Sequence, residues 1–227
     1  DWDRRIQHMN VVHAMALAIE LFPTARNLAL NLPESGRSFA DGAVRARRND
    51  DDRGDGSTVL PDLIHEALWG ASLWRRTQAP DGGIIGGVEY SLDGSEGSVS
   101  WNPVQRTFAY APEEWASYRF VLGAAKLGHV ITHVCGDAVL GAALIAEAEA
   151  AWDWAEAVFA KAQAEGTYND DDGVAMARAR MPASAALFRA TGRRDACMVF
   201  EALNPYAPTD EVAAAGVRRS DVAMFAI

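Results

Sequence analysis

The chain has 227 residues, of which 49% are hydrophobic and 23% charged, a composition that suits one globular domain with an ordinary core. Acidic residues number 31 against 21 basic ones, for a formal net charge of -10, and because an acidic chain repels phosphate backbones we expect no nucleic-acid partner. The apolar stretches are shorter than the ~20 residues that cross a bilayer, so we expect no membrane span either.

Alanine-rich segments with a 3.6-residue period dominate the chain, and loops rich in Gly, Pro and Asp separate them. In the first segment, Met9, Val12, Ala16 and Ile19 share one face before Pro23 ends the pattern. We expect helices over residues 4–22, 61–78, 112–133, 137–163 and 174–190, with room for two short helices in 195–227.

Two features qualify this helical pattern. Pro182 lies inside the last long helix and predicts a kink or a boundary there, whereas Thr191-Gly192 is a typical C-terminal cap. Only residues 83–90 and 97–101 resemble strands, and we expect them to form a short hairpin between the second and third helices.

The loops alternate between short and long, which predicts antiparallel helix pairs in either a bundle or a toroid of helical hairpins. Loops as long as 31–60 and 79–111 are unusual in a plain bundle, and loops of that size are often functional. In a toroid they would gather on one face and form a cleft. We therefore look for the chemistry in these loops.

The first three residues place two carboxylates, Asp1 and Asp3, around the indole of Trp2. This combination suits sugars, because carboxylates act on the glycosidic bond and its water while an indole stacks on the apolar face of a pyranose. Asp3 has a second interpretation as the N-cap of a helix that begins at Arg4, with Trp2 as its hydrophobic staple. Asp1 has no such helical role.

Seven segments carry a resemblance, in one order along residues 1 to about 195. They are D-W-D-R-R-I-Q-H at 1–8, L-N-L-P-E-S-G at 30–36, L-P-D-L-I-H-E-A-L-W-G at 60–70, T-Q-A-P-D-G-G at 77–83, Y-A-P-E-E-W-A-S-Y at 110–118, A-W-D-W-A at 151–155 and A-L-F-R-A-T-G at 186–192. Together they resemble the catalytic domain of glycoside hydrolase family 9, the cellulase and endoglucanase family. Its D-A-G-D motif ends on the Asp that matches Asp1.

The resemblance implies an all-α (α/α)6 barrel, a toroid of helical hairpins that is incomplete in this chain, with residues 1–227 as one partial catalytic domain. It implies hydrolysis of β-linked glucans or related oligosaccharides with inversion, no cofactor, and a secreted protein. Asp1 inherits the role of the general base that deprotonates the attacking water. The family's general acid is a Glu in an N-E-x-x-x-x-W-N segment, which the 227 residues do not contain, so we expect these residues alone to be inactive.

Aromatic residues in or beside the loops are candidate sugar contacts. They are Trp2, Trp101, Tyr110, Trp115 and Tyr168. Ordinary core or loop packing is the alternative for each of the last four. A non-catalytic helical-hairpin domain that binds carbohydrate or a protein partner remains the alternative for the function as a whole.

Two groups of residues are candidate metal ligands. Asp170, Asp171 and Asp172 stand where some members of the family bind calcium, but a solvated run of Asp that caps a helix explains them as well. His129 and His133 are four residues apart without an acidic partner in the motif, so we expect no zinc. Cys135 and Cys197 have no metal-ligand spacing; a disulfide between them is the alternative, and we expect two buried thiols.

Overall fold

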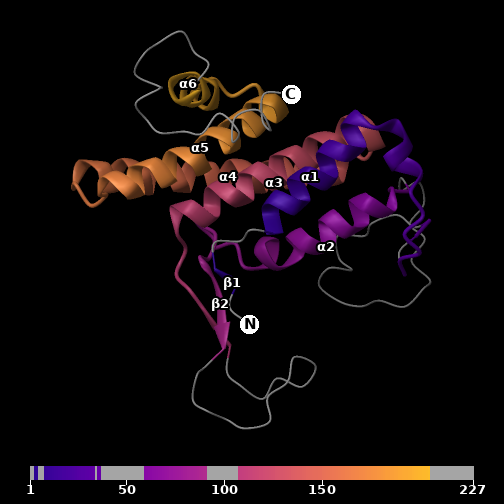
Figure 1. Cartoon of the computed structure of the whole chain (residues 1–227), viewed down its shortest axis with the longest axis horizontal. Coiled ribbons are helices and arrows are strands. Elements are labelled where there is room, and N and C mark those ends of the chain that lie inside the picture. The colour runs from indigo at the N-terminus through magenta and orange to yellow at the C-terminus, as the bar shows by residue number, and fades with distance from the viewer. Residues whose placement is uncertain (1–2, 5–7, 34, 37–58, 91–106, 205–227) are drawn as a thin grey trace.

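The computed structural model describes residues 3–4, 8–33, 35–36, 59–90 and 107–204 (Figure 1). Within them the protein is mostly helical, as expected. The helices are α1 (His8–Leu21), α2 (Asp62–Arg76), α3 (Glu114–Val130), α4 (Ala138–Ala164), α5 (Asp170–Thr191) and α6 (Arg194–Leu203). A short 3-10 helix, η1 (Pro23–Asn27), follows α1, and one π-helical turn, η3 (Ile131–Cys135), extends α3.

The six helices form two rows. Helices α1, α3 and α5 make the inner row, in which α3 packs against both of the others. Helices α2, α4 and α6 make the outer row, and each packs mainly on the inner helix that precedes it in the chain, α1, α3 and α5 respectively. This alternation of inner and outer helices is the arrangement of a toroid of hairpins, which confirms the expected architecture over three hairpins.

Helix α3 is the centre of the core. Between Ala116 and Val130 every residue except Arg119 and His129 is buried, as is typical of a helix covered on several sides. The rings of Tyr118 and Trp152 are fully buried and meet edge to face, with centroids 5.7 Å apart. Helix α4 is fixed to α3 by this pair.

The apolar faces that the sequence predicts lie in this core. All four members of the face predicted for α1 are buried. In α2, Ala67, Leu68, Ala71 and Trp74 are buried on one face, and Leu63 is partly covered. Among the described residues no helix is long and apolar enough to cross a membrane. Cys135 and Cys197 are free thiols, as expected, but they are partly rather than fully buried.

A small antiparallel sheet lies beside the helices, in the order β1 (Asp3–Arg4), β2 (Gly87–Tyr90) and β3 (Thr107–Ala109). Asp3 pairs with Val88, and Val88 pairs with Ala109. The predicted role of Asp3 as the N-cap of a helix starting at Arg4 is therefore wrong, because both residues belong to a strand. The hairpin partner of β2 in the described residues is β3, while residues 97–101 lie outside them.

Helix α5 begins earlier than predicted. Asn169 caps it, since its side chain accepts the N–H of Asp172 at 2.9 Å and the Asp172 carboxylate accepts the N–H of Asn169 at 3.3 Å. Pro182 is inside the helix and does not end it. The predicted C-terminal cap is confirmed at Gly192, which has a φ of 73°.

Candidate functional site

The three inner helices begin at the same end of the molecule. At that end Arg119 of α3 donates a hydrogen bond of 2.6 Å to the side chain of Asn10 in α1, and the Tyr168 hydroxyl just before α5 donates to Glu114 in α3. At the other end Glu20 near the end of α1 pairs with α3 and α5. The inner helices are thus parallel, and their positive N-terminal dipole ends gather where a carboxylate is favoured.

The sheet joins the start of the chain to this end. The Tyr110 N–H donates to the Gly87 carbonyl at 3.0 Å, and the Glu113 N–H donates to the Ile84 carbonyl at 3.0 Å. Strand β3 therefore leads directly into α3, and β1 is the edge strand on the other side of β2 in the same sheet. Asp1, Trp2 and Trp101 lie outside the described residues.

Two predicted sugar contacts, Tyr110 and Trp115, lie on the segment that enters α3, and both are partly buried. The guanidinium carbon of Arg119 is 5.4 Å from the centre of the Trp115 ring, one turn along the helix. Because the cation covers part of the indole, a sugar could stack only on what remains exposed of this ring.

Tyr168 reaches the same end from the loop between α4 and α5. Its hydroxyl donates to Glu114, which precedes Trp115 in the first turn of α3. Its ring stacks on Phe159, with centroids 5.7 Å apart and planes 29° apart. Burial, and then the Glu114 carboxylate, raise the pKa of Tyr168 well above its ordinary value, so the phenol stays neutral at any working pH.

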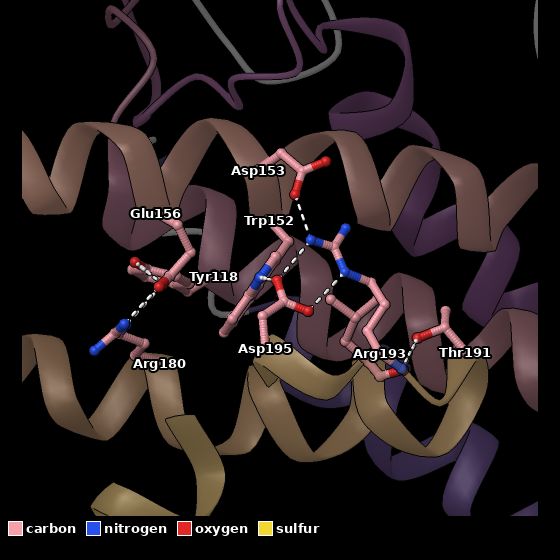
Figure 2. Close-up of polar contacts among 9 residues, drawn as sticks. Tyr118, Trp152, Asp153, Glu156, Arg180, Thr191, Arg193 and Asp195 are labelled. Atoms are coloured by element: carbon pink, nitrogen blue, oxygen red, sulfur yellow. Dashed lines mark hydrogen bonds and ion pairs between the residues drawn. The ribbon is translucent and has the colours of Figure 1, made fainter. Parts of the chain in front are cut away.

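Figure 2 shows an ion pair between Arg180 and Glu156, and the same Arg180 contacts the Phe159 ring. Arg180 of α5 binds the Glu156 carboxylate of α4 through two nitrogens, one of them at 2.7 Å, and the Tyr118 hydroxyl donates to the same carboxylate at 2.7 Å. The guanidinium carbon of Arg180 is 4.5 Å from the centre of the Phe159 ring. The aromatic pair therefore rests on a hydrogen-bonded support from three helices.

Sequence reasoning missed the partners of the predicted residues. In the sequence Glu114 is only one position of the Y-A-P-E-E-W-A-S-Y segment, and neither Arg119 nor Arg180 belongs to any of the seven segments. No local signal could have found them, because Glu114 and Tyr168 are 54 residues apart in the chain.

Several motif segments contact one another. The Asp62 carboxylate accepts the Ser35 hydroxyl at 2.7 Å, which joins the second and third segments. The Trp154 indole N–H donates to Asp81 at 3.1 Å, which joins the fourth and sixth. These motif residues hold the scaffold together.

The Asp run is arranged as a helix start. Asp170–Asp172 are the first turn of α5, and Asp172 takes part in the capping box described above. In the part of the chain that the structure describes, no three His, Cys, Asp or Glu residues form a group that could hold a metal ion. His129 and His133 have ring centroids 4.6 Å apart, without a third ligand among those residues.

Comparison with known proteins gives a fold. No family model matches the sequence, and no curated protein matches it. The chain is similar to the crystal structure of a metagenome-derived glycoside hydrolase family 9 endoglucanase, at 20% identity and a TM-score of 0.62, covering 94% of this chain and 36% of that one. It is also similar to a structure described as Bacteroides ovatus GH9, at 15% identity and a TM-score of 0.63, covering 98% and 42%.

The chain thus spans well under half the length of each structure that it matches. Within that span, its two rows of helices superpose on part of the (α/α)6 barrel of glycoside hydrolase family 9 structures, which is the fold that the sequence resemblance implied.

Proposed function

We propose that this chain is part of the catalytic domain of an inverting glycoside hydrolase that cleaves β-linked glucans, with Asp1 as its general base. One observation carries the proposal: β1, which starts two residues after Asp1, is bonded to the sheet that leads into the N-terminal end of α3. Two residues of chain span at most about 7 Å. This short separation between β1 and the position assigned to the base supports the proposal, because the sheet leads to the end where the inner helices begin.

The chemistry follows from the role of the base. Asp1 takes a proton from water, the water oxygen attacks the anomeric carbon from the face opposite the leaving sugar, and a general acid about 6.5–9.5 Å away protonates the leaving oxygen. The resemblance assigns that acid to a Glu of the N-E-x-x-x-x-W-N segment. The positive helix ends would stabilise the Asp1 carboxylate before it accepts the proton.

Aromatic side chains at the same end would bind the sugar. Tyr168 and Trp115 are partly buried; Trp115 lies in the first turn of α3, Tyr168 is bonded to Glu114 in the same turn, and Tyr110 lies just before this helix. Partly exposed aromatic rings suit a pyranose, which has one apolar face and a polar rim. Trp2 and Trp101 are assigned the same role from the sequence.

A reducing-sugar assay tests the base. It uses the longest natural polypeptide that contains these 227 residues, with β-1,4-glucan and short cello-oligosaccharides as substrates. We expect Asp1→Ala to lower kcat about 10²–10⁴-fold, the usual contribution of general base catalysis. The exposed Glu165 provides a matched control, since Glu165→Gln removes a carboxylate on the surface. Unchanged activity in Asp1→Ala would overturn the assignment.

A binding module without chemistry is the second candidate. One observation favours it: the described residues supply partly exposed aromatic rings, Tyr110, Trp115 and Tyr168, which suit a sugar and need no catalytic group. Calorimetry of the 227-residue chain with cello-oligosaccharides separates the two functions. Binding by this chain, together with no turnover in the longer polypeptide, would support the binding module and overturn the hydrolase.

A further inference from the structure

We propose that Glu114 is a positioning residue, which fixes the ring of Tyr168 as a stacking surface for one hexopyranose unit. The inference rests on the proposed carbohydrate function and adds a residue that acts through Tyr168 and does not touch the sugar. Glu114 lies in the first turn of α3, and its carboxylate accepts the Tyr168 hydroxyl.

The backbone around Tyr168 is held on both sides. Before it, the Thr167 N–H donates to the Ala162 carbonyl at 3.0 Å, and after it Asn169 begins the capping box of α5. With the backbone fixed, the direction of the ring depends on the two side-chain torsions. Glu114 holds the hydroxyl end of the side chain, which leaves the ring little freedom to turn.

The ring is also supported from behind. Phe159 stacks on it, and Arg180 packs on Phe159 while bound to Glu156. The layered order of a phenol, a phenyl ring and a guanidinium gives Tyr168 a backing that comes from α4 and α5. Preorganised rings bind more tightly, because immobilising a rotamer-rich side chain on binding costs about 0.5–1.5 kcal/mol.

A carboxylate suits this positioning role. It has only acceptor atoms, so it takes the phenol proton without competing as a donor, and it lies at a helix N-terminus where negative charge is favourable. Because the pKa of Tyr168 is raised, the phenol keeps its proton and remains a donor. Glutamine at position 114 would keep an acceptor oxygen, whereas alanine would remove it.

Four variants of the full chain test the inference: Glu114→Gln, Glu114→Ala, Tyr168→Phe and the Glu114→Ala/Tyr168→Phe double variant. The readouts are Kd for cellotetraose by calorimetry and the melting temperature. We expect Glu114→Ala and Tyr168→Phe each to raise the Kd roughly 5–10-fold, because each variant must immobilise one more side chain when the sugar binds. Glu114→Gln should stay within about twofold of the wild type, and the double variant should bind no more weakly than either single one.

Turnover by the longer polypeptide adds a readout that a purely structural role would not move. Glu114→Ala should raise KM and leave kcat within about twofold, because the residue orders binding and not the chemical step. Two results would overturn the positioning role while the carbohydrate function stands. One is a Kd of the double variant that is raised by the product of the two single-variant effects, and the other is wild-type affinity in Glu114→Ala. No cellotetraose binding by the wild type would instead overturn the carbohydrate function and this inference together.

Discussion

Glu20 and Lys126 form a buried ion pair at the end of the molecule opposite the candidate site. The Lys126 side chain is 5% exposed and that of Glu20 is 13% exposed. The same carboxylate also binds Arg189 at 2.5 Å and lies 3.7 Å from the His129 ring nitrogen. One carboxylate from α1 therefore joins α3 and α5, which fixes the parallel arrangement of the inner row.

Removing that carboxylate should destabilise the fold. We expect Glu20→Gln to lower the free energy of unfolding by about 3–5 kcal/mol, because it leaves the Lys126 ammonium buried without its counter-charge. Urea denaturation followed by circular dichroism measures the change. Glu165→Gln, in the exposed pair with Lys161, is the control and should stay within about 0.5 kcal/mol.

We attribute the loss of stability expected in Glu20→Gln to the buried, unpaired Lys126 ammonium and not to lost packing. The double variant Glu20→Gln/Lys126→Met removes both charges and should therefore regain most of the lost stability. A double variant as unstable as Glu20→Gln would contradict this explanation.

Asp195 anchors α6 to α4, and its loss should loosen α6 alone (Figure 2). Its carboxylate accepts the Trp152 indole N–H at 3.2 Å and binds Arg193, which also reaches Asp153. The bond with Arg193 lowers the pKa of Asp195 to about 2. We expect Asp195→Ala to raise amide exchange in 194–203 while α3 stays protected, at a cost of about 1 kcal/mol for these half-exposed pairs.

The linked pH dependence has a definite sign. The pKa of Asp195 is lower in the folded state than in the unfolded chain, so its contribution is full above the ordinary Asp pKa. It declines as pH falls from there through about 2. Exchange that is equal in the variant and the wild type at pH 5 would contradict the anchoring role.

The helical fold could be predicted from sequence because it depends on local periodicity. The face of Met9, Val12, Ala16 and Ile19 was correctly placed, since apolar residues three and four apart must share a side of a helix. The role of Asp3 could not be predicted, because the strand that contains it is formed with Val88, far along the chain.

The candidate site was predictable only in part. The sequence indicates Tyr168 and Trp115 as aromatic residues near loops, but the bond from Tyr168 to Glu114 at the start of α3 depends on the packing of α3 and α5. The presence of Pro182 inside α5 also depends on parts of the chain that are distant in sequence. Pro182 lies in a buried part of α5, where neighbouring helices replace the stability that the missing N–H would have provided.

Acid should destabilise the protein through His13. Burial, and then the positive charge of Lys126, lower the pKa of His13 to about 4. Between the ordinary His pKa of about 6.5 and pH 4 the unfolded chain binds a proton that the folded protein does not, so stability falls as pH decreases across this window. Above pH 6.5 His13 contributes no slope.

Denaturation in urea from pH 4 to 8 measures this slope. His13→Gln should lose less free energy of unfolding than the wild type between pH 6.5 and 4, by at most about 3 kcal/mol. The same substitution at the exposed His8 should leave the slope in place. If the wild type and His13→Gln lose stability equally between pH 6.5 and 4, another group carries the acid sensitivity.

Gly82 should be the least replaceable residue of the turn that precedes β2. Its φ is 102°, and a Cβ added there would lie 2.3 Å from the Ala150 carbonyl oxygen of α4. Rotation of a side chain cannot relieve the overlap, because the two nearest atoms are the backbone carbonyl oxygen and carbon of Ala150. The strain likewise lies in the backbone of residue 82 itself. We expect Gly82→Ala to lower the free energy of unfolding by more than about 3 kcal/mol, the sum of left-handed strain and overpacking.

Gly166 separates these two causes. Its φ is 64°, and a Cβ there meets nothing within 4 Å, so Gly166→Ala carries strain alone and should cost about 1–2 kcal/mol. The difference between the two variants, measured by urea denaturation, is the cost of pushing this turn away from α4. Because the Trp154–Asp81 hydrogen bond spans the same contact, Gly82→Ala should also shift tryptophan fluorescence, whereas Gly166→Ala should not. Equal costs at the two glycines would mean that the turn moves freely, and that the P-D-G-G segment does not set the position of the sheet.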